Sequence, residues 1–383
     1  MESMSQQSKF EYINIMKYRY LRSGKQAKTL ILDEVCTNCG YERKYAIKVL
    51  RGTRKLSGGT RGRKKKYSSI IEPLQQIWLA ANLPCGKLLK ASLPLWLEHY
   101  QFHFEPLNEL ERDLLLTVSA AQIDRLLAPT RIKYAKRKRS TKPGSLLCKE
   151  IPFAVDCPND RGTCGHLEVD TVAHCGGSMR GSFVNSVTFT DIKTQWTIVR
   201  AIWSKNAHAV TSLMDEVCAS FPFAIKSVDF DNGSEFINEE FVGYCRRNGF
   251  DLMRSRPYKK NDNAHVEQKN WTHVRELLGY ERFDDPSLVG ELNELYRDYW
   301  NPYQNYFCAK MKLVGKTRIG SKYQKTYDTP QTPYERASSE LPELNKPELD
   351  PFELKKCIDK KLKTINAILQ KKRAAPSLGM GLD

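Results

Sequence analysis

The chain lacks several features that would place it in a common class at once. Its 383 residues contain no run of eighteen apolar residues, so no membrane-spanning helix is expected. The first residues, MESMSQQSKFEY, lack the apolar core of a secretory signal. Eleven cysteines, an odd number without regular spacing, favour a reducing cytoplasm over a disulfide-bonded scaffold. We therefore expect a cytoplasmic protein without a membrane span, long enough for two or three domains.

Acidic residues are scarce in the first part of the chain. Residues 1–150 contain 29 Lys and Arg but 13 Asp and Glu, whereas residues 151–383 contain 32 against 31. Almost all of the net charge of +17 therefore lies in residues 1–150. A basic region of this kind favours a polyanionic partner. We expect residues 1–150 to bind nucleic acid and residues 151–383 to have a different activity.

Residues 1–55 are expected to form a helix-turn-helix domain. The segment QAKTLILDEVCTNCGYERKYAIKVLRG reads as a helix, a turn at Gly40 and a second helix. The outer face of the second helix carries Lys44, Lys48 and Arg51 at i, i+4 and i+7, an arrangement that can enter a major groove. A plain helical hairpin with a solvated basic face is the alternative. The apolar residues expected to face inward are Leu30, Ile31, Val35, Ala46, Ile47 and Leu50.

Two basic linkers are expected to contact DNA phosphates as well, and the runs 51–67 and 131–142 contain no acid. Residues 56–67 are rich in Gly and Ser, so they should be flexible, and their arginines could lie in a narrow minor groove. Residues 131–150 begin with a second basic run and contain a Pro-Gly stop. Such contacts add affinity without sequence specificity. The candidate contacts are Arg61, Arg63, Lys64, Arg137, Lys138 and Arg139.

Residues 68–130 read as a second helical block with a possible DNA-binding role. Its first helix has an apolar stripe typical of a core. Further on, one helix ends at Val118 and another begins, with Ser119 as its expected N-cap. This pattern is typical of the second half of a helix-turn-helix, but many helical hairpins share it. The residues expected to be buried are Ile71, Leu74, Ile77, Trp78, Ala81, Ile123, Leu126 and Leu127.

From residue 151 to residue 300 the pattern changes to alternating strands and helices. Three consecutive strands, followed by alternating helices and strands, predict a mixed five-stranded sheet flanked by helices. The expected strands are 166–173, 181–191, 195–203, 225–231 and 251–256. The expected helices are 206–220, 239–248 and 263–279.

Three acids stand out within this sheet region. Asp170 lies on the first expected strand, Asp231 ends the fourth, and Glu267 lies on the following helix, with thirty-five residues between the last two. Phosphodiester chemistry requires an activated water or hydroxyl and neutralisation of phosphate charge. Two Mg²⁺ ions about 4 Å apart provide both and prefer carboxylate oxygens. These three acids are therefore the candidate metal ligands and catalytic residues.

Other polar residues near the triad have other expected roles. Asp229 shares a strand face with Asp231 and could be a further ligand or a supporting group. Glu168 is expected to face solvent, and Asp191 to support a hairpin turn. No general-base role is assigned to His265. Three basic residues are candidate DNA contacts, with a solvated position as the alternative: Lys259, Lys260 and Lys269.

Around the acids, the sequence resembles the integrase core of retroviral integrases and, more closely, of bacterial insertion-sequence transposases. The stretches DNGSEF and KNDNAHVEQKN carry this resemblance, together with the basic helical front and the tail. It implies an RNase H-like fold and two Mg²⁺ or Mn²⁺ ions held by Asp170, Asp231 and Glu267. It also implies a homo-oligomer on double-stranded DNA that cleaves transposon ends and joins the 3′ hydroxyls to target DNA, associated with the nucleoid.

The chain departs from retroviral integrases at a possible zinc site. Those proteins begin with a His-His-Cys-Cys module, but no histidine here precedes His99. The pair Cys36 and Cys39 has no second pair at zinc spacing, and we interpret it as a turn with small buried side chains. A second cluster also lacks a matching spacing, which argues against zinc: Cys157, Cys164, His166, His174 and Cys175.

The C-terminal part is less informative. Residues 301–340 could be a small β-rich module that touches DNA or an arm that packs on a neighbouring subunit. Residues 341–383 contain a helical tail with an apolar stripe, which predicts core packing or self-association. The stripe consists of Leu354, Ile358, Leu362, Ile365 and Leu369.

The sequence thus predicts a DNA transposase with metal-dependent strand cleavage and joining. Two alternatives remain open. One is a sequence-specific DNA-binding regulator with an inactive core, against which the three intact acids count. The other is a metal-dependent nuclease that does not join strands, against which the two candidate DNA-binding regions count.

Overall fold

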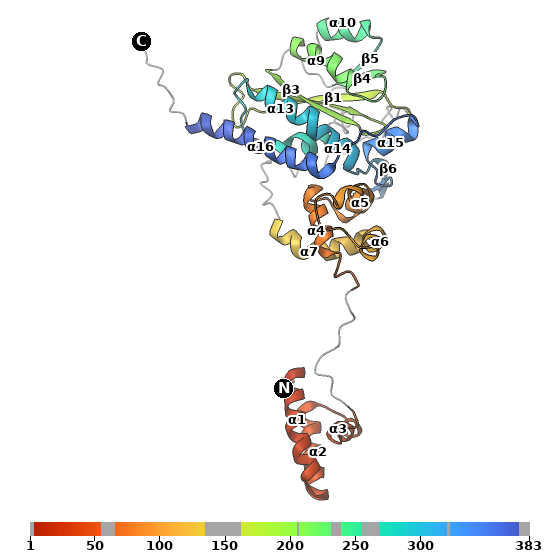
Figure 1. Cartoon of the computed structure of the whole chain (residues 1–383), viewed down its shortest axis with the longest axis vertical. Helices are drawn as coiled ribbons and strands as arrows, with labels where there is room; N and C mark the ends of the chain where they lie inside the picture. The colour runs from red at the N-terminus through yellow and green to blue at the C-terminus, as the bar shows by residue number, and fades with distance from the viewer. Residues whose placement is uncertain are drawn as a thin grey trace. The chain divides into compact units, whose positions relative to one another are not determined.

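The computed structural model describes residues 4–54, 66–134, 162–204, 207–230, 239–254, 268–319 and 322–374. The chain divides into two compact units, residues 1–68 and residues 69–383 (Figure 1). Among the described helices, none combines the length and the apolar character that crossing a bilayer requires.

The first unit consists of three helices that pack pairwise: α1 (Gln6–Arg22), α2 (Lys25–Cys39) and α3 (Arg43–Leu50). Gly40 ends α2 in the left-handed region, with φ of +65°, which glycine adopts without a steric penalty. Ile31, Val35 and Leu50 are buried in the shared core, as predicted. Leu30 was predicted to be buried, but it is 71% exposed. Leu32 is buried instead, because it lies three residues before Val35 and so shares its face of α2.

The second unit begins with a block of four helices, which we call the helical block: α4 (Ile71–Ala80), α5 (Gly86–Tyr100), α6 (Glu109–Thr117) and α7 (Ala120–Tyr134). Most of the predicted stripe on α4 is buried. The predicted break between α6 and α7 is present, and Ser119 Oγ accepts a hydrogen bond from the backbone N–H of Gln122 at 3.3 Å. Ile123 and Leu127 face inward, while Leu126 is half-buried.

A mixed five-stranded sheet follows, as predicted. Its strands are β1 (His166–Ala173), β2 (Val184–Asp191), β3 (Thr197–Trp203), β4 (Ser227–Phe230) and β5 (Asp251–Arg254). Their order in the sheet is β3-β2-β1-β4-β5. The first three strands pair antiparallel, whereas β4 and β5 run parallel to β1. Strand β1 is therefore the central strand, with a neighbour on each side.

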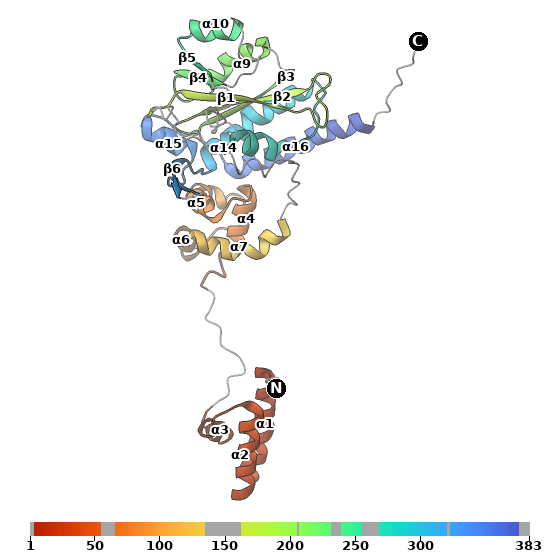
Figure 2. The same cartoon turned by 180° about the vertical axis from the view of Figure 1, so that it is seen from behind.

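Helices cover both faces of this sheet (Figures 1 and 2). On one face lie α9 (Ala207–Ala219) and α10 (Glu239–Arg247), whose apolar residues join the core of the sheet. On the other lie the π-helical segments η1 (Asn270–Arg275) and η2 (Leu295–Trp300), together with α12 (Glu276–Leu278), α13 (Leu288–Glu294) and α14 (Asn301–Phe307). Each strand of β1–β4 is thus buried along most of its length.

Strand β3 lies at an edge of the sheet, yet its backbone groups are paired. Three asparagines of the α13–α14 segment take the place of a neighbouring strand. The side-chain amide of each accepts a hydrogen bond from one backbone N–H of β3 and donates one to the carbonyl of the same β3 residue. Asn293 pairs in this way with Ala201, Asn301 with Val199 and Asn305 with Thr197, at 2.7–3.3 Å. Four helical residues rise about 6 Å, close to two residues of a strand, so Asn301 and Asn305 match alternate residues of β3. This closes an edge that could otherwise pair with another chain.

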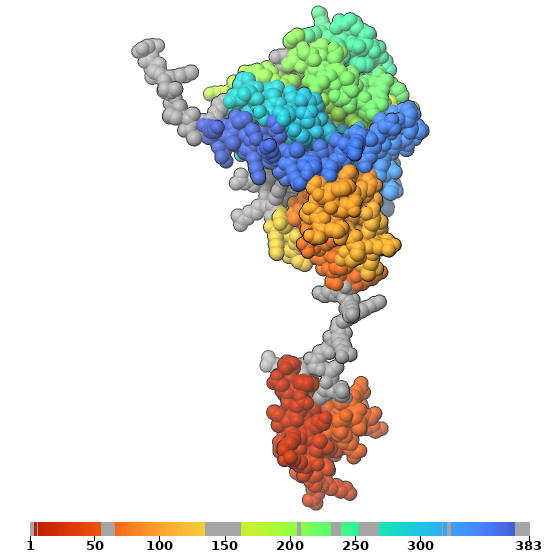
Figure 3. Space-filling view, viewed as in Figure 1, coloured from red at the N-terminus to blue at the C-terminus, as the bar shows by residue number. Residues whose placement is uncertain are grey.

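The C-terminal part contains a hairpin, β6 (Leu313–Ile319) and β7 (Lys322–Tyr327), and two helices, α15 (Pro333–Glu340) and α16 (Pro351–Ala374). The apolar stripe of α16 is core rather than surface, with Leu354, Ile358, Ile365 and Leu369 buried. Figure 3 shows this C-terminal segment lying against both the sheet region and the helical block.

The helical block is joined to the sheet region by an aromatic cluster around Trp96. The indole of Trp96 is fully buried, contacts the rings of Tyr303, Phe307 and Phe352, and donates a hydrogen bond to the carbonyl of Phe307 at 3.2 Å. Tyr303 in turn donates from its hydroxyl to the carbonyl of Ala80 at 2.6 Å. The helical block and the sheet region are therefore parts of one compact unit.

Candidate active site

Asp170 lies in the middle of the central strand β1, where its backbone pairs with Thr188 of β2. Its side chain is half-buried. One carboxylate oxygen accepts a hydrogen bond from the backbone N–H of Thr171 at 2.7 Å. The other accepts from the side-chain amide of Asn270 at 2.6 Å. The carboxylate is therefore held in one orientation by a donor from its own strand and a donor from a helix.

Asn270 is the first residue of η1 and lies one hundred residues after Asp170. The sequence motif around Glu267 includes this asparagine, but sequence reasoning gave it no role. Its hydrogen bond to Asp170 fixes the start of this helical segment against β1. A further bond, from Arg275 to the carbonyl of Ala173 at 2.9 Å, fixes the end of η1 to the end of the same strand. The sequence contained a signal for this role, because Asn270 lies three positions after Glu267 and residues three apart on a helix share a face.

Two more carboxylates lie near Asp170, one on the same strand and one on the neighbouring strand β4. Glu168 of β1 and Asp229 of β4 are Cα partners in the parallel register, and they are 1% and 4% exposed. Glu168 was predicted to face solvent, and this prediction is wrong, because the central strand is covered on both faces. Since alternate residues of a strand share a face, Glu168 and Asp170 lie on the same side of the sheet.

Asp191 supports the β2–β3 turn, as predicted, and also accepts hydrogen bonds from the start of β1. Its fully buried carboxylate accepts from the backbone N–H and hydroxyl of Thr194, both at 2.7 Å, and from the backbone N–H of Gly165 and His166. It thus ties the turn to the start of β1, which carries Asp170. Burial raises the pKa of this carboxyl group, and the four donors oppose that rise.

The histidines near β1 are engaged in hydrogen bonds. His166 bonds to Ser227 Oγ at 2.9 Å, and His174 bonds to Ser186 Oγ at 2.8 Å. Burial lowers the pKa of His174 to about 3, so its ring is neutral near pH 7. Across the described ranges, no three His, Cys, Asp or Glu residues lie close enough to hold a metal ion. Of the zinc cluster considered from the sequence, Cys157 lies outside those ranges.

Several predicted site residues lie outside the described residues. Asp231 and Glu267 are among them. The same holds for all of the linker and loop cations named as DNA contacts: Arg61, Arg63, Lys64, Arg137, Lys138, Arg139, Lys259 and Lys260.

The remaining candidate DNA contacts differ in exposure. Lys44, Lys48 and Arg51 are exposed on or just after α3, on the side away from the buried Ala46 and Leu50. Three residues separate α2 from α3, the length typical of a helix-turn-helix.

Lys269, by contrast, is 2% exposed, and its side chain lies in the interior. Lys269 therefore does not lie on the surface of the molecule. Cys39 also departs from its expected place, because it lies in the last helical turn of α2 and not in the turn that follows.

Comparisons with known proteins agree with this arrangement. Residues 161–260, which include β1 to β5, match the family described as "Integrase core domain". The "Uncharacterized protein y4rM" of Sinorhizobium fredii is 37% identical over 336 residues, which cover 87% of this chain and 96% of that protein.

Two solved structures are also similar. The catalytic core domain of BIV integrase is 14% identical, with a TM-score of 0.31, over 46% of this chain and 97% of that one. The simian T-cell lymphotropic virus intasome with a PP2A regulatory subunit is 12% identical, with a TM-score of 0.30, over 43% and 67% of the respective chains. The identity and length of the y4rM alignment lead to one conclusion: the chain belongs to the family of y4rM, and its residues 161–260 match the integrase core domain.

Proposed function

We propose that this protein is a transposase that binds the ends of a DNA element, cleaves one strand and joins the freed 3′ hydroxyl to target DNA. The observation that carries the proposal is the hydrogen bond between Asp170 and Asn270. It brings the first expected metal ligand to the helix that directly follows the expected third ligand. Integrase core domains are polynucleotidyl transferases, which agrees with this chemistry.

Covalent geometry supports placing all three acids at one site. Asp231 directly follows Phe230, whose Cα partner in β1 is Val169, the residue before Asp170. Since one peptide unit spans about 3.8 Å, this pairing supports the proposal that Asp170 and Asp231 belong to one site. Glu267 precedes Asn270 by three positions in the sequence, the spacing at which two residues share a face wherever the chain is helical.

A divalent metal suits the donor set of this site. The described part offers a half-buried carboxylate, Asp170, which accepts a hydrogen bond from the side-chain amide of Asn270. Carboxylate oxygen is the ligand that Mg²⁺ and Mn²⁺ prefer. Asp170, Asp231 and Glu267 would hold two such ions, which supply an activated water or hydroxyl and neutralise charge at phosphorus. Asn270 would keep the Asp170 carboxylate oriented toward them.

The three-helix unit is the proposed reader of the DNA ends. Exposed Lys44, Lys48 and Arg51 offer a row of cations on one short helix. The helical block, with the α6–α7 pair, is the second proposed DNA-binding element. Because two ends must be processed together, we expect a homo-oligomer on double-stranded DNA.

A strand-transfer assay tests the proposal. Full-length protein is incubated with Mg²⁺, a labelled duplex carrying an element end, and a target plasmid. We expect joined products for the natural chain and none for Asp170→Asn or Glu267→Gln. Cleavage without joining would instead identify a nuclease, and binding without either product would identify a DNA-binding regulator. Joining at the natural rate by Glu267→Gln would contradict the role given to that residue.

A further inference from the structure

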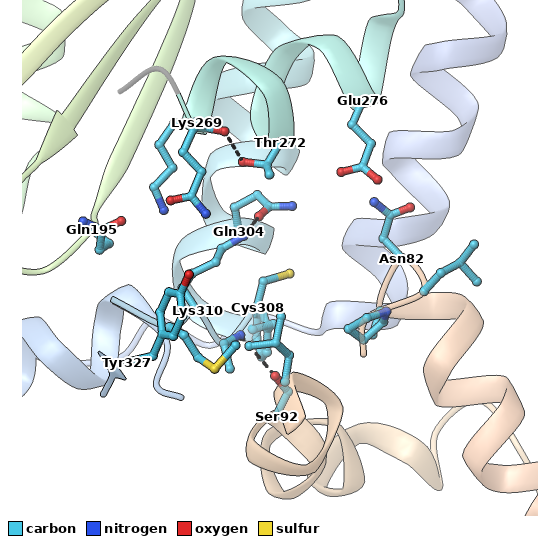
Figure 4. A pocket seen from close by; sticks show the side chains of 18 residues that line it. Asn82, Ser92, Gln195, Lys269, Thr272, Glu276, Gln304, Cys308, Lys310 and Tyr327 are labelled. Atoms are coloured by element: carbon cyan, nitrogen blue, oxygen red, sulfur yellow. Dashed lines mark hydrogen bonds between the residues drawn. The ribbon is translucent and has the colours of Figure 1, made fainter. Parts of the chain in front are cut away.

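A cavity of about 410 Å³ lies where the helical block meets the sheet region (Figure 4). Three parts of the second unit form it. The α4–α5 turn supplies residues 81–84, the helical segment from Gln268 to Glu276 supplies one wall, and residues 304–311 supply another. None of these residues belongs to the candidate active site. Asn270, which contacts Asp170, is absent from the lining, whereas its neighbour Lys269 lines the cavity.

Lys269 is an unusual residue for such a position. Its side chain is 2% exposed, and none of the hydrogen bonds or ion pairs found among the described residues involves its ammonium group. A buried charge without a partner is costly, so it is retained in few places. Figure 4 shows Lys269 on the helical wall, Lys310 on the opposite side and Gln304 between them. The ammonium group of Lys310 donates to the side-chain oxygen of Gln304.

The charges around the cavity are predominantly positive. Lys269 and Lys310 both line it, and Arg336 donates a hydrogen bond to the carbonyl of Lys310 at 3.0 Å. Arg336 forms an ion pair with Asp328, whereas no carboxylate forms an ion pair with Lys269 within the described ranges. Among the lining residues the one acid is Glu276, whose field acts on Lys310. An anion in the cavity would therefore lie beside two lysine side chains and one acid.

The backbone at the cavity is strained. Four non-glycine residues have a positive φ in the part of the chain that the structure describes, and three of them line this cavity: Asn82, Leu83 and Gln195, with φ of 62–63°. Each such residue costs on the order of 1 kcal/mol or more, and strain of this kind gathers at functional sites. Gln195 is also 3% exposed, so solvent contact does not explain its conformation.

From these observations we infer that the cavity binds a phosphate group, with the ammonium groups of Lys269 and Lys310 as its cationic contacts. The hydroxyl of Thr272 lies in the same wall as Lys269, where it donates a hydrogen bond to the carbonyl of Gln268 at 3.2 Å. Leu88, Phe307 and Met311 provide apolar walls, so the phosphate can be attached to an organic group. Its source is either a free phosphate compound or the backbone of bound DNA, since both present the same oxygens.

Thermal unfolding of the full chain in a phosphate-free buffer tests the inference. Inorganic phosphate should raise the Tm with increasing concentration, because a ligand of the folded state stabilises it. Lys269→Met should raise the Tm without phosphate, since it removes a buried unpaired charge, and should weaken phosphate binding about tenfold or more. Lys363→Met, at an exposed lysine of α16, is the matched control and should leave both quantities unchanged.

Two further arms identify the source of the phosphate. If a nucleoside monophosphate binds more tightly than inorganic phosphate and loses affinity in Lys269→Met, the natural ligand is a free compound. If the affinity for duplex DNA falls in that variant instead, the cavity holds a backbone phosphate. Lys310→Met provides a second test, should Lys269→Met fail to fold.

The inference is wrong if phosphate leaves the Tm of the natural chain unchanged or raises it equally in Lys269→Met and Lys363→Met. Asp170→Asn should retain phosphate binding, which separates this result from that of the strand-transfer assay.

Discussion

The bond between Asn270 and Asp170 leads to a quantitative prediction for Asn270→Ala. The substitution removes the one side-chain donor that the described structure gives to the Asp170 carboxylate, at 2.6 Å, and leaves the backbone donor of Thr171 in place. The carboxylate is retained but loses one of the hydrogen bonds that fix its orientation. We therefore expect weaker metal binding and not the complete loss expected for Asp170→Asn.

The size of the effect follows from the charge of the acceptor. A hydrogen bond to an ionised group contributes about 1.5–3 kcal/mol, which corresponds to roughly ten- to one-hundredfold in a binding constant. Removing groups that orient metal ligands has effects of the same size, about 10–100-fold. The Mg²⁺ concentration for half-maximal joining should rise by this factor, and saturating Mg²⁺ should restore much of the rate.

The assay is a Mg²⁺ titration of strand joining for the natural chain, Asn270→Ala and Asn345→Ala. Asn345 is exposed, forms none of the hydrogen bonds found in the described structure and is the matched control. Thermal unfolding of the three proteins shows whether Asn270→Ala also destabilises the fold. An unchanged Mg²⁺ requirement in a folded Asn270→Ala protein would refute the reasoning. Loss of joining that no Mg²⁺ concentration restores would show that Asn270 does more than orient Asp170.

Three further predictions follow from other parts of the chain. The double substitution Lys44→Ala and Lys48→Ala should weaken binding of element ends, and the slope of log affinity against log salt should fall by about 0.9 per lost phosphate contact, measured by fluorescence anisotropy. Asn301→Leu should lower the free energy of unfolding by about 2–6 kcal/mol in urea, because one N–H and one carbonyl of β3 lose their partner. Asp350→Asn should lower the Tm at pH 7 but not in acid, because it breaks the 2.8 Å contact to His103.

The sign of the last effect comes from the pKa of Asp350. Burial alone would raise this pKa, but the hydrogen bonds from His103 and two backbone N–H groups outweigh burial and lower it. The carboxylate therefore contributes stability above its unfolded pKa, about 3.9, and loses it as the pH falls through the lower folded value. A constant Tm difference from pH 7 to acid would contradict this account. The prediction for Asn301→Leu is contradicted if its free energy of unfolding falls no further than that of Asn345→Leu. The prediction for Lys44 and Lys48 is contradicted if the slope of log affinity against log salt does not change.

The order and type of the core elements could be predicted from the sequence because their signals are local. The run from residue 166 to residue 173 alternates as a strand does, and β1 has these bounds. The capping role of Ser119 also depends on residues only three apart. Burial was harder to predict. Glu168 looked like a surface residue because its charge suggests solvent, and only the position of β1 at the centre of the sheet explains its burial.

Features that depend on residues far apart in the chain could not be predicted. Trp96 and Phe307 are separated by 211 positions, so nothing near either residue shows that the helical block packs on the sheet region. The same holds for Lys269, whose helical position is evident from the sequence but whose burial against Lys310 and the α4–α5 turn is not. Asn270 was within a recognised motif, yet its role needed the partner that folding brings to it.

The packing of Trp96 has a consequence for how the protein is made. A ribosome delivers Trp96 long before Phe307, and at about 5–20 residues per second the interval is on the order of 10–40 s. During that time, the face of α5 that carries this indole has no partner, and the nascent helical block presents an aromatic surface suited to a chaperone. Release of any chain that stops before α14 would leave that surface permanently uncovered, so truncated products should be the first to be degraded.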